Sequence, residues 1–156
     1  MSSGGVSRRF PRDEEFTEAF VRQPQYGRGS TRFILLRLER SFEHKEPVDL
    51  TALTIEHILP QTLTPPWRDM LGARAEHIHS TLLNTLGNLT LTGYNPELSN
   101  LPFDEKKAKL TDTHVELNRW LLQQLTWTDS EVLTRAQALL DRAKAIWPGP
   151  ETPLKV

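Results

Sequence analysis

The sequence contains no cysteine among its 156 residues, and this absence removes several kinds of chemistry at once. Disulfide bonds, thiol nucleophiles and zinc sites built from cysteine are all excluded, and a chain without cysteine fits a reducing compartment. The sequence also lacks any long apolar run, so we expect neither a membrane span nor a secretory signal peptide. Together these absences lead us to expect a cytoplasmic protein that has no contact with a membrane.

An excess of charge is missing as well, because the formal net charge is only -1 at pH 7. A protein that holds nucleic acid through bulk electrostatics needs a strong positive excess, so any phosphate contact in this chain has to come from a local patch. Hydrophobic residues make up 37% of the sequence, which at this length is enough for one globular domain with a real core.

Most of the chain has the apolar periodicity of helices, with hydrophobic residues recurring every three or four positions. The helical segments that we predict are 13–23, 30–44, one around 66–83, 103–110, 113–125 and 129–147. We expect residues 1–12 to be a flexible leader or an expression remnant and residues 149–156 to be a disordered tail. The Trp side chains lie mostly in helical contexts, which favours a role in the core.

Two short segments in the middle of the chain have the pattern of strands instead. Residues 53–59 are enriched in apolar and β-branched side chains and end at Pro60, and residues 88–92 (NLTLT) alternate Leu with Thr. The second segment is followed by turn residues and then by the predicted helix 103–110. The sequence therefore predicts a predominantly helical α+β fold that contains a ββα order of elements.

The stretch TIEHILPQ (54–61) places Glu56 and His57 side by side inside the first predicted strand. A neutral imidazole can take a proton from water when its other ring nitrogen is oriented by a hydrogen bond, whereas a single histidine is more often a structural residue. Neighbours on a regular strand face opposite sides, so Glu56 could simply face solvent. Both side chains can reach one site only if the strand ends or twists there, as Pro60 allows.

This stretch, followed by LGNLTLTGYNPELSNLPFDEKK, resembles the C-terminal HNH domain of GmrSD-type restriction endonucleases, including phosphorothioate-sensing SspE-like proteins. These are ββα-metal (His-Me finger) nucleases. The resemblance covers residues 13–148 and implies N-terminal helices at 13–52, a ββα-metal core with two antiparallel strands at 53–110, and C-terminal helices at 111–148. It also implies a metal-dependent DNA endonuclease that nicks one strand at a time in bacterial restriction or phage defence. The expected partners are DNA, often modified foreign DNA, and a ParB-like nucleotide-hydrolysing domain N-terminal to this one.

The resemblance further implies roles for individual residues. His57 would be the general base, and Asn88 matches the middle asparagine of the HNH signature, which holds the connecting loop over the base. Glu56 and Asn95 would bind Mg²⁺, with Mn²⁺ as a substitute, since a hard cation prefers oxygen ligands. Asn95 can also be read as a helix N-cap, and Asn100 can be read as a cap or as the metal ligand in place of Asn95.

Two lysines on the predicted helix 103–110 are candidates for binding DNA phosphate. We expect Lys106 to contact the backbone, and Lys107 either does the same or belongs to a solvated charged face. Two other functional classes remain open. One is an HNH-like module that has lost its chemistry and serves DNA docking or regulation, and the other is a helical interaction domain, which leaves TIEHILPQ unexplained.

Overall fold

The computed structural model describes residues 13–43, 49–93 and 95–147, with Asp13, Asn95 and Pro96 described by their backbone alone. The expected leader (1–12) and tail (149–156) lie outside these residues. The described chain is a predominantly helical α+β domain, as predicted. Its α-helices are α1 (Asp13–Arg22), α2 (Thr31–Arg40), α3 (Pro65–Leu71), α4 (Ala75–Leu82), α5 (Asn95–Leu98), α6 (Phe103–Leu110), α7 (Arg119–Leu122) and α8 (Asp129–Ile146).

The sheet consists of two antiparallel strands, β1 (Thr54–His57) and β2 (Leu89–Thr92). Glu56 lies opposite Thr90, and His57 lies opposite Leu89. Both strands were predicted, but β1 is shorter than the predicted strand segment 53–59. The chain leaves the ladder after His57 because the next two backbone N–H groups bind Asn88, one to its carbonyl oxygen and one to its side chain. Pro60 then has no N–H to continue the pairing.

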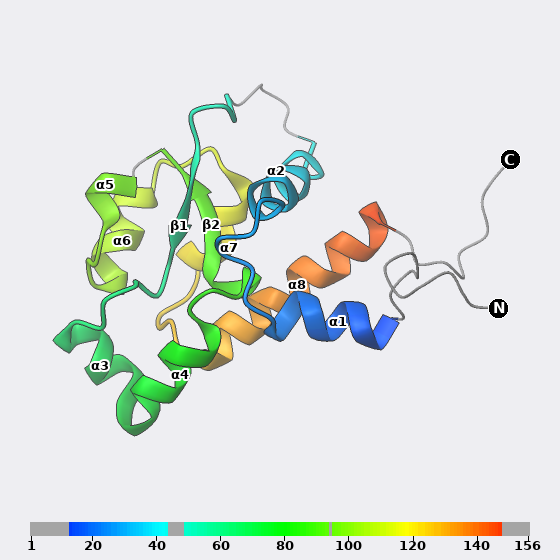
Figure 1. Cartoon of the computed structure of the whole chain (residues 1–156). Coiled ribbons are helices and arrows are strands. Elements are labelled where there is room, and N and C mark those ends of the chain that lie inside the picture. The colour runs from blue at the N-terminus through cyan, green and yellow to red at the C-terminus, as the bar shows by residue number, and fades with distance from the viewer. Residues whose placement is uncertain (1–12, 44–48, 94, 148–156) are drawn as a thin grey trace, which may run out of the picture.

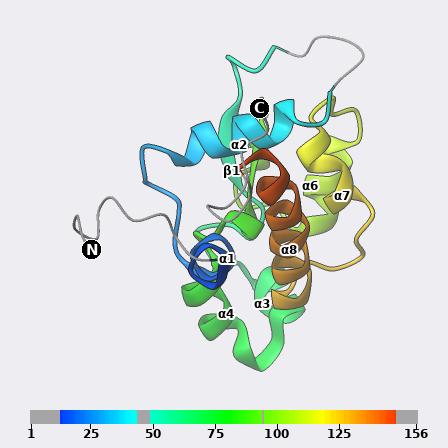
Figure 2. The ribbon, with the colours of Figure 1, turned by 90° about the vertical axis from the view of Figure 1, so that its right-hand side faces the viewer.

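The strands lie at the centre of the molecule, and the helices surround them (Figure 1). In that view α5 and α6 lie on one side of the strands, α2 and α8 on the other, and α3 and α4 below. Turning the molecule by 90° shows α8 running along the domain with α2 crossing above it (Figure 2). The short sheet is therefore held in place by helices from both ends of the chain.

The core is divided into two clusters that share α8. One cluster contains Leu89 and Leu91 of β2 together with apolar residues of α1, α2 and α8. The other contains Trp67, Phe103 and Trp127, and it joins α3, α4, α6 and α7. The predicted core role is confirmed for these two tryptophans, which are almost completely buried.

The turn before β2 packs closely on α8. It is a short 3₁₀ helix, η3 (Leu86–Asn88), and any side chain at Gly87 would collide with the Val132 carbonyl oxygen and the Ala136 side chain. Arg135 of α8 is buried there and donates hydrogen bonds to the carbonyl oxygens of Leu86, Gly87, Leu89 and Leu117. Burial lowers the pKa of Arg135 to about 10, so the guanidinium remains charged at neutral pH. Arg135 thus fixes the entry to β2.

Two of the predicted helices are interrupted. The segment around 66–83 is divided into α3 and α4 by the 3₁₀ turn η2 (Gly72–Arg74), because Gly72 adopts a φ of 76°, which glycine tolerates best. The segment 113–125 contains only the 3₁₀ turn η4 (Glu116–Asn118) and α7. The first two N–H groups of η4, those of Glu116 and Leu117, donate to the buried Glu39 carboxylate of α2 instead of extending a helix.

Candidate active site

His57 is the last residue of β1, and its imidazole is held by a side chain from another part of the chain. Nε2 lies 2.8 Å from Oδ1 of Asn84, which follows α4. An amide oxygen only accepts hydrogen bonds, so Nε2 carries the proton in this pair and Nδ1 is the unprotonated nitrogen. Burial lowers the pKa of His57, the Asn84 hydrogen bond acts against that shift, and the charge of Lys106 adds to it. The imidazole is therefore neutral at pH 7.

Tyr26 covers one side of His57. The two ring centroids are 4.4 Å apart in an edge-on arrangement, and 43% of Tyr26 remains exposed. The backbone N–H groups of Gln25 and Tyr26 both donate to the carbonyl oxygen of Asn84, at 2.7 and 3.1 Å. Asn84 therefore holds the His57 ring with its side chain and the Tyr26 segment with its backbone.

Glu56 forms a buried ion pair. Its Oε2 lies 2.6 Å from Nζ of Lys106, and the two side chains are only 5% and 2% exposed. The same ammonium group donates to the His57 carbonyl oxygen at 2.7 Å. Burial raises the pKa of Glu56 and lowers that of Lys106, and their mutual attraction acts against both shifts. Lys106 thus fixes the Glu56 carboxylate and the end of β1 together.

The position of Lys106 corrects the expectation that it lies on a DNA-facing surface. Phe103, Lys106 and Leu110 recur at helical spacing on α6, and this stripe faces the interior. Lys107 is bonded within the protein too, because its Nζ donates to the Gln124 carbonyl oxygen at 2.7 Å and lies 3.5 Å from the Asp104 carboxylate. Both ammonium groups are therefore already engaged.

Asn88 attaches the loop after β1 to the rest of the domain. Its side chain accepts from the Leu59 N–H at 2.8 Å and from Trp127 Nε1 at 3.0 Å, and it donates to the carbonyl oxygens of Leu59 and Leu83. His79 adds a contact between its Nε2 and the Pro60 carbonyl oxygen, 2.9 Å apart. These bonds fix the loop that follows His57 in the chain.

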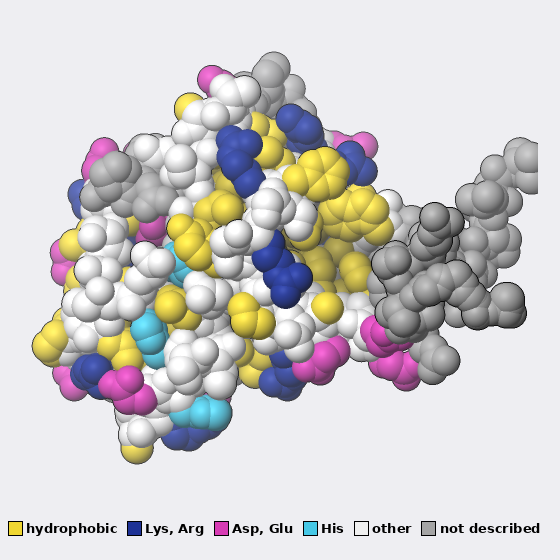
Figure 3. All heavy atoms as spheres, in the orientation of Figure 1, with side chains coloured by type: hydrophobic (Ala, Val, Ile, Leu, Met, Phe, Trp, Pro, Cys, Tyr) yellow, Lys and Arg dark blue, Asp and Glu magenta, His cyan; other side chains and the backbone are white. Residues whose placement is uncertain are grey.

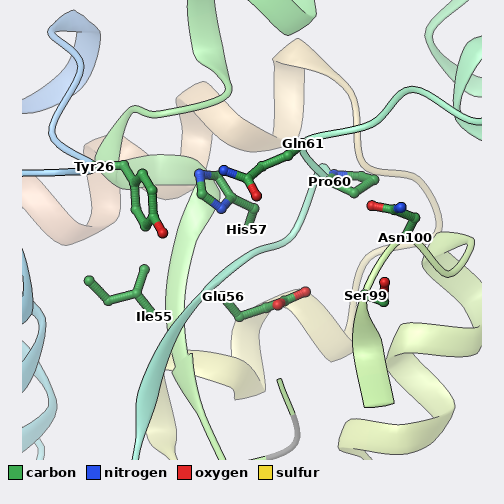
Figure 4. Close-up of a pocket in the computed structure, with 8 residues that line it drawn as sticks. All are labelled: Tyr26, Ile55, Glu56, His57, Pro60, Gln61, Ser99 and Asn100. Carbon is green, nitrogen blue, oxygen red and sulfur yellow. The ribbon is translucent and has the colours of Figure 1, made fainter. Parts of the chain in front are cut away.

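Beside His57 lies a hollow of about 290 Å³ with a mostly polar lining. The residues that line it are Tyr26, Ile55, Glu56, His57, Pro60, Gln61, Ser99 and Asn100. Figure 4 shows the His57 ring next to Tyr26, with the Glu56 carboxylate extending toward Ser99 and with Asn100 near Pro60. Glu56 and His57 thus line one hollow although they are neighbours in sequence, because β1 ends at His57 and the chain turns away.

The oxygen atoms around the hollow are of the kind that a hard divalent cation prefers. Glu56 offers a carboxylate, Ser99 a hydroxyl and Asn100 an amide oxygen. In the part of the chain that the structure describes, no three His, Cys, Asp or Glu residues gather as metal ligands. A cation here would be held by few protein oxygens and by water, which is how Mg²⁺ commonly binds. The side chain of Asn95 lies outside the described residues.

The sequence did not point to Asn84 and Tyr26. Both lie far from His57 along the chain, and neither belongs to a recognisable motif. One signal was available for Tyr26, namely an aromatic residue placed beside two glycines and an arginine in the polar segment YGRGS (26–30). The contact of each residue with His57 depends on the tertiary fold.

The fold and the hollow define an α+β domain with a polar site at the end of a two-stranded antiparallel sheet. The family model for the C-terminal domain of GmrSD restriction endonucleases matches residues 10–142, which is most of the chain. The protein belongs to this family, so it is a module related to the restriction endonucleases, and the family implies DNA as its substrate. No curated protein and no solved structure matches the chain. Among the helices that the structure describes, none has the length and apolar character to cross a membrane.

Proposed function

We propose that this domain is an HNH-type, metal-dependent DNA endonuclease that nicks one strand with His57 as the general base. The observation that carries the proposal is the state of His57. Its Nε2 is engaged by Asn84, its pKa is lowered by burial, and its ring lines a polar hollow. A general base needs this combination of a fixed ring and a neutral imidazole at working pH.

In the proposed reaction, Nδ1 of His57 accepts a proton from a water molecule, and the water oxygen attacks the scissile phosphorus. The P–O bond to the leaving sugar oxygen breaks, and that oxygen takes a proton from solvent. Asn84 keeps the proton on Nε2 and therefore keeps Nδ1 available. Tyr26 limits the access of bulk water to one side of the ring. Asn88 holds the loop that follows the base and so maintains its position relative to the hollow.

Glu56 and Asn100 are the described residues that we propose to hold Mg²⁺, or Mn²⁺ in its place. Asn95, whose side chain lies outside the described residues, is the ligand that the family resemblance favours over Asn100. A bound divalent cation supplies positive charge beside the leaving oxygen and the non-bridging phosphate oxygens. Lys106 holds the Glu56 carboxylate in one position, although it also neutralises part of its charge. Weak binding of the cation is the expected consequence.

The family also suggests a biological setting. We propose that the domain acts in bacterial restriction or phage defence, in the cytoplasm, together with a ParB-like nucleotide-hydrolysing domain that selects the foreign DNA. The net charge of -1 supports this division of labour, because a domain without a positive excess binds DNA weakly by itself.

The Lys106–Glu56 pair favours one alternative function. A lysine ammonium group already lies 2.6 Å from the carboxylate that a metal would need. If the pair persists when DNA is bound, the domain is a DNA-docking or regulatory module that has kept the nuclease fold without its chemistry.

Nicking of supercoiled plasmid distinguishes the two functions. The protein is compared with His57→Ala in Mg²⁺, in Mn²⁺ and in EDTA, and His114→Ala serves as a control because His114 is an exposed histidine of the same chain. Circular dichroism checks that each variant is folded. Nicking that requires metal and is lost only in His57→Ala supports the nuclease. The docking module is supported if the unchanged protein and His57→Ala nick equally. It is also supported if neither metal gives any nicking while the protein still binds DNA.

A further inference from the structure

The substrate of the proposed nuclease is a polyanion, and the two lysines expected to contact it are bonded within the protein. Lys106 binds Glu56, and Lys107 binds the Gln124 carbonyl oxygen. The positive charge that meets the DNA backbone near the hollow therefore has to come from another element. The segment between α1 and α2 also reaches the hollow, because Tyr26 lines it, and this segment carries Arg28.

This segment has a defined conformation. Its start is tied to Asn84 by the N–H groups of Gln25 and Tyr26, and the Thr31 hydroxyl donates to the Gln25 carbonyl oxygen at the start of α2. Gly27 adopts a φ of 91°, which suits glycine, and the Arg28 N–H closes the turn on the Gln25 carbonyl oxygen. We call residues 25–30 the Tyr26 loop.

Arg28 lies at the tip of the Tyr26 loop, between two glycines. Its side chain is exposed, and it forms no ion pair with any residue that the structure describes. The sequence from Gln23 to Arg32 contains no acidic residue, so nothing within this segment neutralises the guanidinium. Among the residues that the structure describes, Arg28 therefore has no ion-pair partner, and it lies two positions along the chain from Tyr26, whose ring touches His57.

The loop lies on a face whose charges suit a phosphate backbone. In Figure 1 the segment that joins α1 to α2 passes in front of the strands, and Figure 2 shows it at the corresponding edge of the molecule. Figure 3 shows that basic side chains stand near the middle of this face, while most acidic ones lie toward its outline. Histidine side chains are visible on the same face.

We propose that the Tyr26 loop is a DNA-backbone contact, in which Arg28 binds a phosphate next to the one that occupies the hollow and Tyr26 forms the wall between Arg28 and His57. The proposal rests on the proposed function, because it assumes that the scissile phosphate lies in the hollow. A guanidinium suits this task, since it presents several N–H donors to phosphate oxygens and does not lose its charge. The contact is independent of base sequence, because it involves the backbone alone.

The test measures binding in the absence of cleavage. Fluorescence anisotropy with a labelled 20-base-pair duplex in EDTA compares the protein with Arg28→Ala and Arg28→Lys across a range of salt concentrations. Arg40→Ala is the matched control, because Arg40 is exposed at the opposite end of α2, a helix about 15 Å long. The logarithm of the association constant falls as the logarithm of the salt concentration rises. Loss of one phosphate contact is expected to make this slope shallower by about 0.9 and to weaken binding about tenfold near 50 mM salt.

The inference is supported if Arg28→Ala shows this reduction in salt dependence on several duplex sequences and Arg40→Ala does not. Arg28→Lys should then retain most of the salt dependence of the unchanged protein. It is overturned if Arg28→Ala binds like the unchanged protein, if Arg40→Ala has the same effect, or if the unchanged protein does not bind at low salt. The plasmid assay reports separately on the proposed function. Nicking without an effect of Arg28→Ala on binding removes only this inference. An effect of Arg28→Ala on binding without any nicking removes the nuclease and leaves Arg28 as a DNA-backbone contact of a docking module.

Discussion

Replacing Lys106 with methionine should destabilise the domain far more than a surface lysine could. The substitution keeps most of the side-chain volume but removes the ammonium group, which bonds Glu56 Oε2 at 2.6 Å and the His57 carbonyl oxygen at 2.7 Å. Because the Glu56 side chain is only 5% exposed, its carboxylate would remain buried without compensation. Breaking such a pair costs about 3–5 kcal/mol of the free energy of unfolding.

Urea unfolding at pH 7 of the unchanged protein and Lys106→Met measures this cost. Lys109→Met is the matched control, since Lys109 is exposed on the same helix and should change the free energy of unfolding by less than about 0.5 kcal/mol. The double variant Lys106→Met, Glu56→Gln should recover much of the loss, because it leaves no buried charge unpaired. Equal effects of Lys106→Met and Lys109→Met would contradict the buried ion pair.

The pH dependence of the Lys106→Met deficit gives an independent check. Burial raises the pKa of Glu56 above its ordinary value of 4.5, and removal of Lys106 should raise it further. An acid whose pKa is higher in the folded state carries its penalty above the folded pKa and loses it as protonation proceeds below that value. The deficit should therefore be largest near pH 7 and shrink as the pH falls toward 4.5. A deficit that stays constant over this range would refute the assignment to Glu56.

Two further predictions concern the surroundings of the base. Asn88→Ala removes a fully buried side chain that bonds Leu59 and Trp127, and it should lower the free energy of unfolding by about 3–5 kcal/mol in a urea titration, whereas a loss below about 1 kcal/mol would mean that these bonds contribute little. Tyr26→Ala should let water reach His57, so the pKa of His57 rises toward its ordinary value of 6.5, and the acidic limb of the nicking profile moves to higher pH. A lowered histidine pKa makes the folded state lose stability as the pH falls below 6.5. Tyr26→Ala should therefore lose less stability than the unchanged protein in that range. An NMR titration of the imidazole that finds no change in the pKa of His57 would contradict both expectations.

The sequence by itself determined the fold class, the two strands and the family. Leu–Thr alternation predicted β2, helical periodicity predicted most of α1, α2, α6 and α8, and the motif TIEHILPQ placed Glu56 and His57 at one candidate site. These features depend on neighbouring residues in the chain, so a local pattern contains the information. The family match over residues 10–142 confirms the resemblance that the motifs suggested.

The environment of the site was decided only by the tertiary structure. Lys106 belongs to a charged run that is typical of a solvated helix face, yet α6 turns it inward at the same spacing as Phe103 and Leu110. Asn84 and Tyr26 reach His57 from segments far apart in the sequence. Local patterns establish which residues can do chemistry, but burial and partners arise from contacts between distant segments. The fold therefore decides whether a lysine compensates a carboxylate or meets a phosphate.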